Sequence, residues 1–192
     1  QTRSVTATMI ERGINSPRTS SMGRLFDAAA AILGICGQAT YEGEPAIELE
    51  AAAWRALDGE IAISDDNAGY FASGPSWLDG PDVLDQKALF EALLGEIEAG
   101  APADRLALDF HAAVARSSAR IASDICVREG IDTVALSGGV FMNPILLQLL
   151  TRELKSAGLT VLVPHTVPVN DGCIAYGQAA VASARLAQIA SQ

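Results

Sequence analysis

Two short stretches in the C-terminal third of the chain carry the residues best suited to chemistry. In residues 134–143, an apolar run ends in Ser137, Gly138 and Gly139, and Asn143 stands just before a proline. Paired glycines let backbone N–H groups approach a ligand closely, because no Cβ stands in the way. A helix that begins after the turn would direct its free N–H groups to the same place. The pattern suits a phosphate or nucleotide, although many plain strand-to-helix turns use the same residues.

The second stretch, residues 164–172, contains His165, Asn170, Asp171 and Gly172. A carboxylate at the mouth of a nucleotide-type loop is a suitable ligand for a divalent cation, and it could instead position a water molecule. Asp171 at a helix start is equally typical of an N-cap, and Asn143 has the same alternative. The residue types therefore leave a ligand-binding role and a capping role open for both residues.

The elements expected around these stretches would bring them together. Apolar runs predict strands over residues 133–136 and 160–163, with a helix over 144–157 between them and a last helix over about 171–188. Parallel strands joined by such a crossover end at one edge of the sheet, where α/β sheets bind ligands. We therefore expect the two stretches to face each other across a cleft.

The first 130 residues are predicted to be mainly helical. Ser20 or Ser21 is expected to cap the second helix, and His111, inside the longest helix, is interpreted as structural. A period-two pattern predicts a hairpin over residues 60–71. Apolar residues spaced by three or four predict five helices, over residues 2–14, 22–33, 46–57, 83–99 and 104–129.

Composition limits the possible class of protein. The chain has 192 residues, 49% of them hydrophobic, and a formal net charge of -10. An acidic surface repels nucleic acid and anionic membranes, so we expect neither as a primary partner. Three separated cysteines argue against a disulfide framework, and no apolar run reaches the roughly 18 residues of a membrane span. We expect a cytoplasmic protein, and the start at Gln1 without a methionine is interpreted as a piece of a longer one.

Three motifs resemble the C-terminal, Kae1-like region of the HypF family, the hydrogenase maturation carbamoyltransferases. Residues 134–143 and 167–179 resemble two motifs of that family, and residues 19–28 resemble a third in the expected order. The paired loops are also similar to the Kae1/TsaD family of tRNA threonylcarbamoyl transferases and, more distantly, to the O-carbamoyltransferases of antibiotic biosynthesis. The stretch 20–27 favours HypF over both.

The resemblance implies a helix-rich α/β fold, the second half of an actin/Hsp70-like (ASKHA, RNase H-like) ATPase domain, with residues 1–192 as its C-terminal lobe. It implies carbamoyl transfer from carbamoyl adenylate to the C-terminal cysteine of HypE, with ATP and carbamoyl phosphate as substrates of the full-length protein. It implies a divalent metal (Fe, Zn or Mg), for which Asp171 would be the ligand and a catalytic residue. The residues implied to hold the nucleotide are Gly138, Gly139, Asn143, Gly23 and Asp27, the last two on its ribose or adenine side.

The physical requirements of the reaction agree with the resemblance. A carbamoyl adenylate needs a site that holds AMP as the leaving group and polarises the carbonyl, and glycine-turn N–H groups with a metal can do both. The resemblance places two metal-binding histidines outside this chain. Two alternatives stay open. Because of the similar loops, the chain could belong to an O-carbamoyltransferase or a tRNA-modifying relative. Because those histidines are absent from it, the fragment could be a non-catalytic nucleotide-binding or HypE-docking module.

Overall fold

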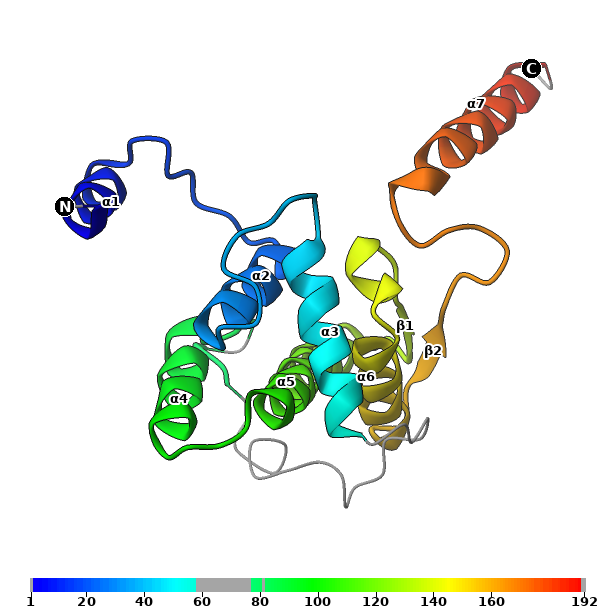
Figure 1. Ribbon diagram of the computed structural model, residues 1–192. Helices are drawn as coiled ribbons and strands as arrows, with labels where there is room; N and C mark the ends of the chain where they lie inside the picture. Colours follow the sequence, from blue (N-terminus) through cyan, green and yellow to red (C-terminus); the bar gives the residue numbers. More distant parts are fainter. Residues whose placement is uncertain (1, 58–76, 81, 191–192) are drawn as a thin grey trace.

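The computed structural model describes residues 2–57, 77–80 and 82–190 (Figure 1). Helices dominate these residues, in agreement with the expected helix-rich α/β class. The predicted hairpin over 60–71 lies outside the described residues. The helices, in chain order, are α1 (Thr2–Arg12), α2 (Met22–Ile32), α3 (Glu44–Ala56), α4 (Gln86–Glu98), α5 (Ala103–Glu129), the 3₁₀ turn η2 (Gly139–Met142), α6 (Pro144–Ser156), the 3₁₀ turn η3 (Asp171–Cys173) and α7 (Ile174–Ala190).

Two short parallel strands form the sheet. Strand β1 (Thr133–Ala135) pairs with β2 (Thr160–Leu162), with Thr133 opposite Thr160 and Ala135 opposite Leu162. Helix α6 connects them and packs against β2. Val134 and Val161 sit on the face that packs against the core. The predicted strand–helix–strand unit is therefore confirmed.

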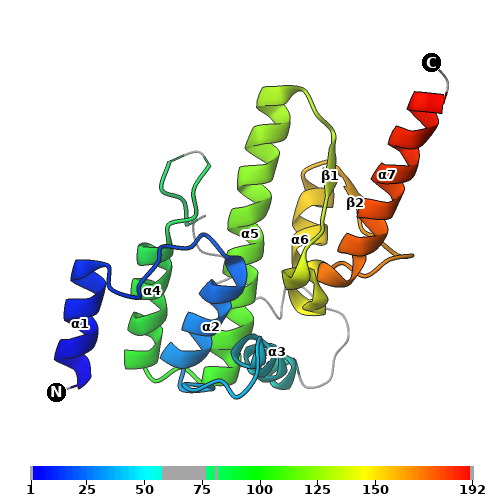
Figure 2. The same ribbon diagram turned by 90° about the horizontal axis from the view of Figure 1, so that it is seen from above.

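Helix α5 is the centre of the described fold (Figure 2). Every residue from Leu106 to Ala115 is buried, including two polar residues, Asp109 and His111. Helices α3 and α6 pack against α5, and α2 packs against α3. Alanines of α2, α3 and α5 are buried in the core that these helices form. Phe26 of α2 meets Phe110 edge-to-face, with ring centroids 5.3 Å apart.

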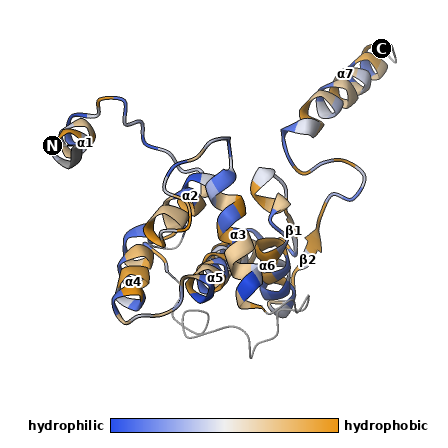
Figure 3. Ribbon diagram, in the orientation of Figure 1, coloured by the Kyte–Doolittle hydropathy of each residue, from blue (hydrophilic) through white to orange (hydrophobic). Residues whose placement is uncertain are grey.

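Helices α1 and α7 extend away from this helical body (Figures 1 and 2). Helix α7 is rich in apolar residues (Figure 3), and its large apolar side chains are exposed. Leu186 is 67% exposed and Ile189 is 70% exposed. Packing against the described residues therefore does not account for the apolar pattern of α7.

Several predicted helix ends moved for identifiable reasons. Helix α4 starts at Gln86 rather than 83, because the Asp85 side chain accepts a hydrogen bond from the Ala88 N–H at 2.9 Å and caps it. Helix α3 starts at Glu44, two residues early, and carries a proline in its first turn, where no N–H is needed. Ser21 does stand at the N-cap of α2, but its hydroxyl makes no capping bond.

Candidate functional site

The glycine turn follows β1 and has a backbone that only glycine adopts easily. Gly138 has φ 114° and ψ 157°, a region that side chains with a Cβ rarely occupy. The four-residue turn η2 then precedes α6. The helix predicted over residues 144–157 is confirmed as α6 (Pro144–Ser156), whereas the short turn η2 before it was not predicted. Pro144 lacks an N–H and fits the first turn of α6, so the helix starts there.

Asn143 is buried at the junction between the glycine turn and α6. Its Oδ1 accepts a hydrogen bond from the Leu146 N–H at 2.9 Å, which makes it the N-cap of α6. Its Nδ2 lies 2.9 Å from Nε2 of His111. The side chain is only slightly exposed, at 8%. The capping alternative for Asn143 is confirmed, and its contact with a nucleotide stays a prediction.

His111 is the polar residue of α5 that reaches this junction. It is fully buried, and its Nδ1 lies 2.7 Å from the Ala107 carbonyl oxygen. Burial lowers the pKa of His111 from 6.5 to about 4, against a smaller opposing effect of the Ala107 hydrogen bond. The structural interpretation of His111 fits this environment, but its link to Asn143 was not foreseen, because the two residues are 32 positions apart.

The glycine turn and the loop before η3 do meet, as expected from the parallel strands. The Gly138 N–H donates to the Val169 carbonyl oxygen at 2.8 Å. The Asn170 side-chain amide lies 3.1 Å from the Met142 sulfur. A Cβ placed on Gly139 would lie 3.9 Å from Cβ of Asn170. The carboxyl ends of both strands therefore share one edge, where α/β sheets bind ligands.

Asp171 begins η3 with its side chain exposed. The capping role falls to its neighbour, since Asn170 Oδ1 accepts a hydrogen bond from the Gly172 N–H at 3.1 Å. This turn favours glycine at 172, because a Cβ there would lie 3.0 Å from that same Oδ1, closer than most Cβ contacts. The N-cap reading of Asp171 was therefore wrong, and its carboxylate is available for another role.

The chain supplies at most part of a metal site within the residues described. No group of three or more His, Cys, Asp or Glu side chains lies close enough there to hold an ion. An exposed carboxylate such as Asp171 fits a single ligand of a hard or borderline divalent cation. Further ligands would have to come from outside the described part of the chain.

Helix α2, with Gly23 and Asp27, contacts η2 of the glycine turn. Asp27 Oδ2 pairs with Arg24 at 3.0 Å, whereas its Oδ1 is buried without a hydrogen-bond partner among the described residues. Burying a carboxylate oxygen without a hydrogen-bond donor costs folding free energy, and such oxygens are rare in native proteins. The first turn of α2 also lacks a side-chain cap. These features are compatible with a ligand near α2, which stays a prediction.

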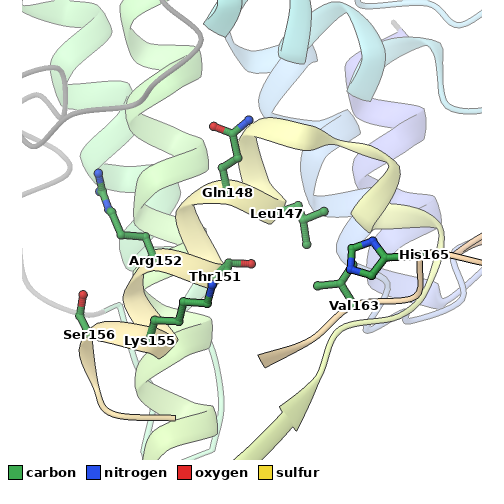
Figure 4. A pocket seen from close by; sticks show the side chains of 8 residues that line it. All are labelled: Leu147, Gln148, Thr151, Arg152, Lys155, Ser156, Val163 and His165. Atoms are coloured by element: carbon green, nitrogen blue, oxygen red, sulfur yellow. The ribbon is translucent and has the colours of Figure 1, made fainter. Parts of the chain in front are cut away.

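A depression among the described residues lies elsewhere, between α6 and the end of β2 (Figure 4). It has a volume of about 620 Å³ and contains His165, which comes from the second predicted loop. None of the predicted nucleotide or metal residues lines it. Its lining consists of Leu147, Gln148, Thr151, Arg152, Lys155, Ser156, Val163 and His165.

Comparison with known proteins identifies the family. Residues 1–178 match the family model of the second subdomain of the carbamoyltransferase Kae1-like domain. The chain is 41% identical over 180 residues to the carbamoyltransferase HypF homolog of Cupriavidus necator, covering 92% of this chain and 44% of that protein. It is 36% identical over 185 residues to carbamoyltransferase HypF of Rhodobacter capsulatus, covering 96% and 22%.

Solved structures give the same result. Full-length HypF in its phosphate- and nucleotide-bound form matches with a TM-score of 0.79 and 31% identity, over 97% of this chain and 23% of that one. HypF of T. kodakarensis matches with a TM-score of 0.76 and 30% identity, over 96% and 22%. The fold and its motifs thus define a Kae1-like carbamoyltransferase subdomain. The chain belongs to the HypF carbamoyltransferase family and spans less than half the length of the relatives it matches.

No helix in the described ranges is long and apolar enough to cross a membrane.

Proposed function

We propose that the full-length protein containing this chain transfers a carbamoyl group from carbamoyl adenylate to the C-terminal cysteine thiol of HypE, in the maturation of the cyanide ligands of [NiFe]-hydrogenase. The observation that carries the proposal is the contact between the glycine turn and the loop before η3. In this contact the Gly138 N–H donates a hydrogen bond to the Val169 carbonyl oxygen. Helix α2, which carries the third motif, contacts the same turn.

In this proposal, the nucleotide lies at the shared edge of β1 and β2. Gly138 and Gly139 present a backbone that no Cβ shields, and Asn143 holds the end of the turn against α6. Gly23 and Asp27 lie on the ribose or adenine side, where the Asp27 carboxylate, whose side chain is 18% exposed, would accept a hydrogen bond from a ligand hydroxyl or amine. ATP, and the AMP portion of carbamoyl adenylate, are the proposed occupants.

The reaction requires the HypE thiolate to attack the carbamoyl carbon while the bond from that carbon to the AMP phosphate oxygen breaks. The thiol proton is lost to solvent before attack, and AMP leaves with the electron pair. Asp171, exposed beside the turn, is proposed to bind a divalent metal together with ligands from outside this chain. Such a metal, when bound, would polarise the carbonyl and stabilise the leaving group.

The test is the Asp171→Ala variant of the full-length protein, with carbamoyl phosphate, ATP and HypE. We expect loss of thiocarbamate on HypE, measured by mass spectrometry, with carbamoyl phosphate hydrolysis retained. Glu98→Ala is a matched control, since Glu98 is an exposed carboxylate near the end of α4. Normal transfer by Asp171→Ala would refute the metal-binding role.

The other carbamoyl acceptors remain distinct outcomes of the same assay. Transfer to a sugar hydroxyl or to tRNA, without transfer to HypE, would favour an O-carbamoyltransferase or a tRNA-modifying enzyme. Nucleotide binding without any transfer by the full-length protein would favour the non-catalytic docking alternative.

A further inference from the structure

We propose that His111 is a positioning residue for the glycine turn: it fixes the orientation of the Asn143 side chain and couples it to α2. The inference deepens the proposed function and rests on it, because it concerns the nucleotide site which that function requires. His111 belongs to none of the three motifs, and it lies on α5, away from the turn in sequence.

Three hydrogen bonds connect the Ala107 carbonyl, the His111 ring, the Asn143 side chain and the Leu146 N–H. Their donors and acceptors can be assigned, because the carbonyl can only accept and the N–H can only donate. The Ala107 carbonyl can only accept, so Nδ1 of His111, 2.7 Å away, carries the proton. Nε2 of the neutral ring is then an acceptor, and Asn143 Nδ2, 2.9 Å away, donates to it. This leaves Oδ1 of Asn143 facing the Leu146 N–H at 2.9 Å. The ring therefore determines which end of the Asn143 amide caps α6.

The arrangement has no equally good alternative. If the Asn143 amide rotated by half a turn, its NH₂ group would face the Leu146 N–H, and its oxygen would face the unprotonated Nε2. Both contacts would be repulsive. Because His111 and Asn143 are buried, water would not replace the lost hydrogen bonds. The burial that lowers the pKa of His111 keeps the ring neutral, so Nε2 remains an acceptor near neutral pH.

The same ring touches the helix that carries the third motif. Phe26 of α2 packs edge-to-face on His111, with ring centroids 5.0 Å apart and an interplanar angle of 81°. The next residue along α2 is Asp27, whose Oδ1 is buried without a partner among the described residues. One imidazole therefore joins the two walls proposed to hold the nucleotide, α2 on one side and the end of the glycine turn on the other.

Two substitutions separate the two hydrogen bonds of the ring. A glutamine at 111 can place its amide oxygen near the position of Nε2 and keep an acceptor for Asn143. An asparagine at 111 can place its amide nitrogen near Nδ1, keeping the donor to Ala107 but losing the acceptor for Asn143. We therefore compare His111→Gln and His111→Asn in the full-length protein, with AMP affinity by calorimetry and thermal unfolding measured for each.

We expect His111→Asn to weaken AMP binding by about tenfold, and His111→Gln to restore most of that loss. In an Asn143→Ala background, His111→Asn should weaken binding no further, because the effect acts through Asn143. If His111→Asn does not fold, Asn143→Ser keeps a capping oxygen but shortens the side chain, so that it no longer reaches Nε2 of His111. It should produce the same loss.

The outcomes distinguish the inference from the function on which it rests. Wild-type affinity in His111→Asn, or equal losses in the two variants at 111, would overturn the positioning role and leave the proposed function intact. A further loss in the Asn143→Ala background would assign His111 a general packing role instead. If the wild-type protein bound no AMP, both the inference and the proposed nucleotide site would fail.

Discussion

At the scale of single residues, His111 is a buried neutral imidazole, and this makes folding depend on pH. The pKa of His111 is about 4 in the folded protein, below its ordinary value of 6.5. Between these two values the unfolded chain binds a proton that the folded chain does not. The stability that His111 provides is therefore complete above pH 6.5 and is lost as the pH falls toward 4.

This linkage predicts a difference between the wild type and His111→Gln. The free energy of unfolding of the wild type, relative to His111→Gln, should fall by about 3 kcal/mol between pH 7 and pH 4. Urea unfolding of both proteins across this range measures it. Carboxylates titrate in both proteins and largely cancel in the comparison. A difference that stays constant with pH would show that His111 is not buried in its neutral form.

Two aspartates at helix starts are predicted to behave differently. Asp85 caps α4 through the Ala88 N–H, whereas Asp171 leaves the capping of η3 to Asn170. Asp85→Ala should therefore lower the free energy of unfolding by about 1 kcal/mol. Asp171→Ala should leave it nearly unchanged, and thermal unfolding of the two variants tests this. Equal destabilisation would restore a capping role for Asp171.

At the scale of elements, the glycine turn depends on a backbone conformation rather than on a side chain. Gly138 adopts φ 114°, and nothing lies within 4 Å of a Cβ placed there. The cost of Gly138→Ala is therefore conformational, on the order of 1–3 kcal/mol. We expect the turn to shift and nucleotide affinity to fall, as calorimetry on the full-length protein would measure.

Gly95→Ala is the matched control for this substitution. Gly95 lies inside α4, and a Cβ there also meets nothing within 4 Å, but its φ is not positive. Alanine should stabilise the helix by about 1 kcal/mol and leave nucleotide affinity unchanged. If Gly138→Ala behaved like Gly95→Ala, the glycine turn would be a connection without a binding role.

The helices and strands with a strong apolar period could be predicted from the sequence. Contacts between residues far apart in the sequence could not. The crossover from β1 through α6 to β2 follows from residues 133–163, and the meeting of the loops that follow the two strands was expected from that crossover. The bond between His111 and Asn143 joins residues 32 positions apart, and no local pattern indicates it. The 3₁₀ turn η2 was missed because only the glycines at its start, Gly138 and Gly139, stood out in the sequence.

At the scale of the whole molecule, three separate motifs come together around the glycine turn, and the central helix α5 connects two of them. Helix α5 carries His111, to which α2 contributes Phe26 and the glycine turn contributes Asn143. The loop before η3 reaches the same turn through Gly138. Membership of the HypF family, with 97% of the chain superimposed on full-length HypF at a TM-score of 0.79, fits this gathering of motifs.

The central claim is that this fold serves carbamoyl transfer to a protein thiol. The most direct measurement is the mass of the C-terminal peptide of HypE after incubation with the full-length protein, ATP and carbamoyl phosphate. The account predicts the mass increase of one carbamoyl group on the cysteine, only when both small substrates are present. An unmodified cysteine, with the carbamoyl group found on tRNA or on a sugar hydroxyl instead, would contradict it.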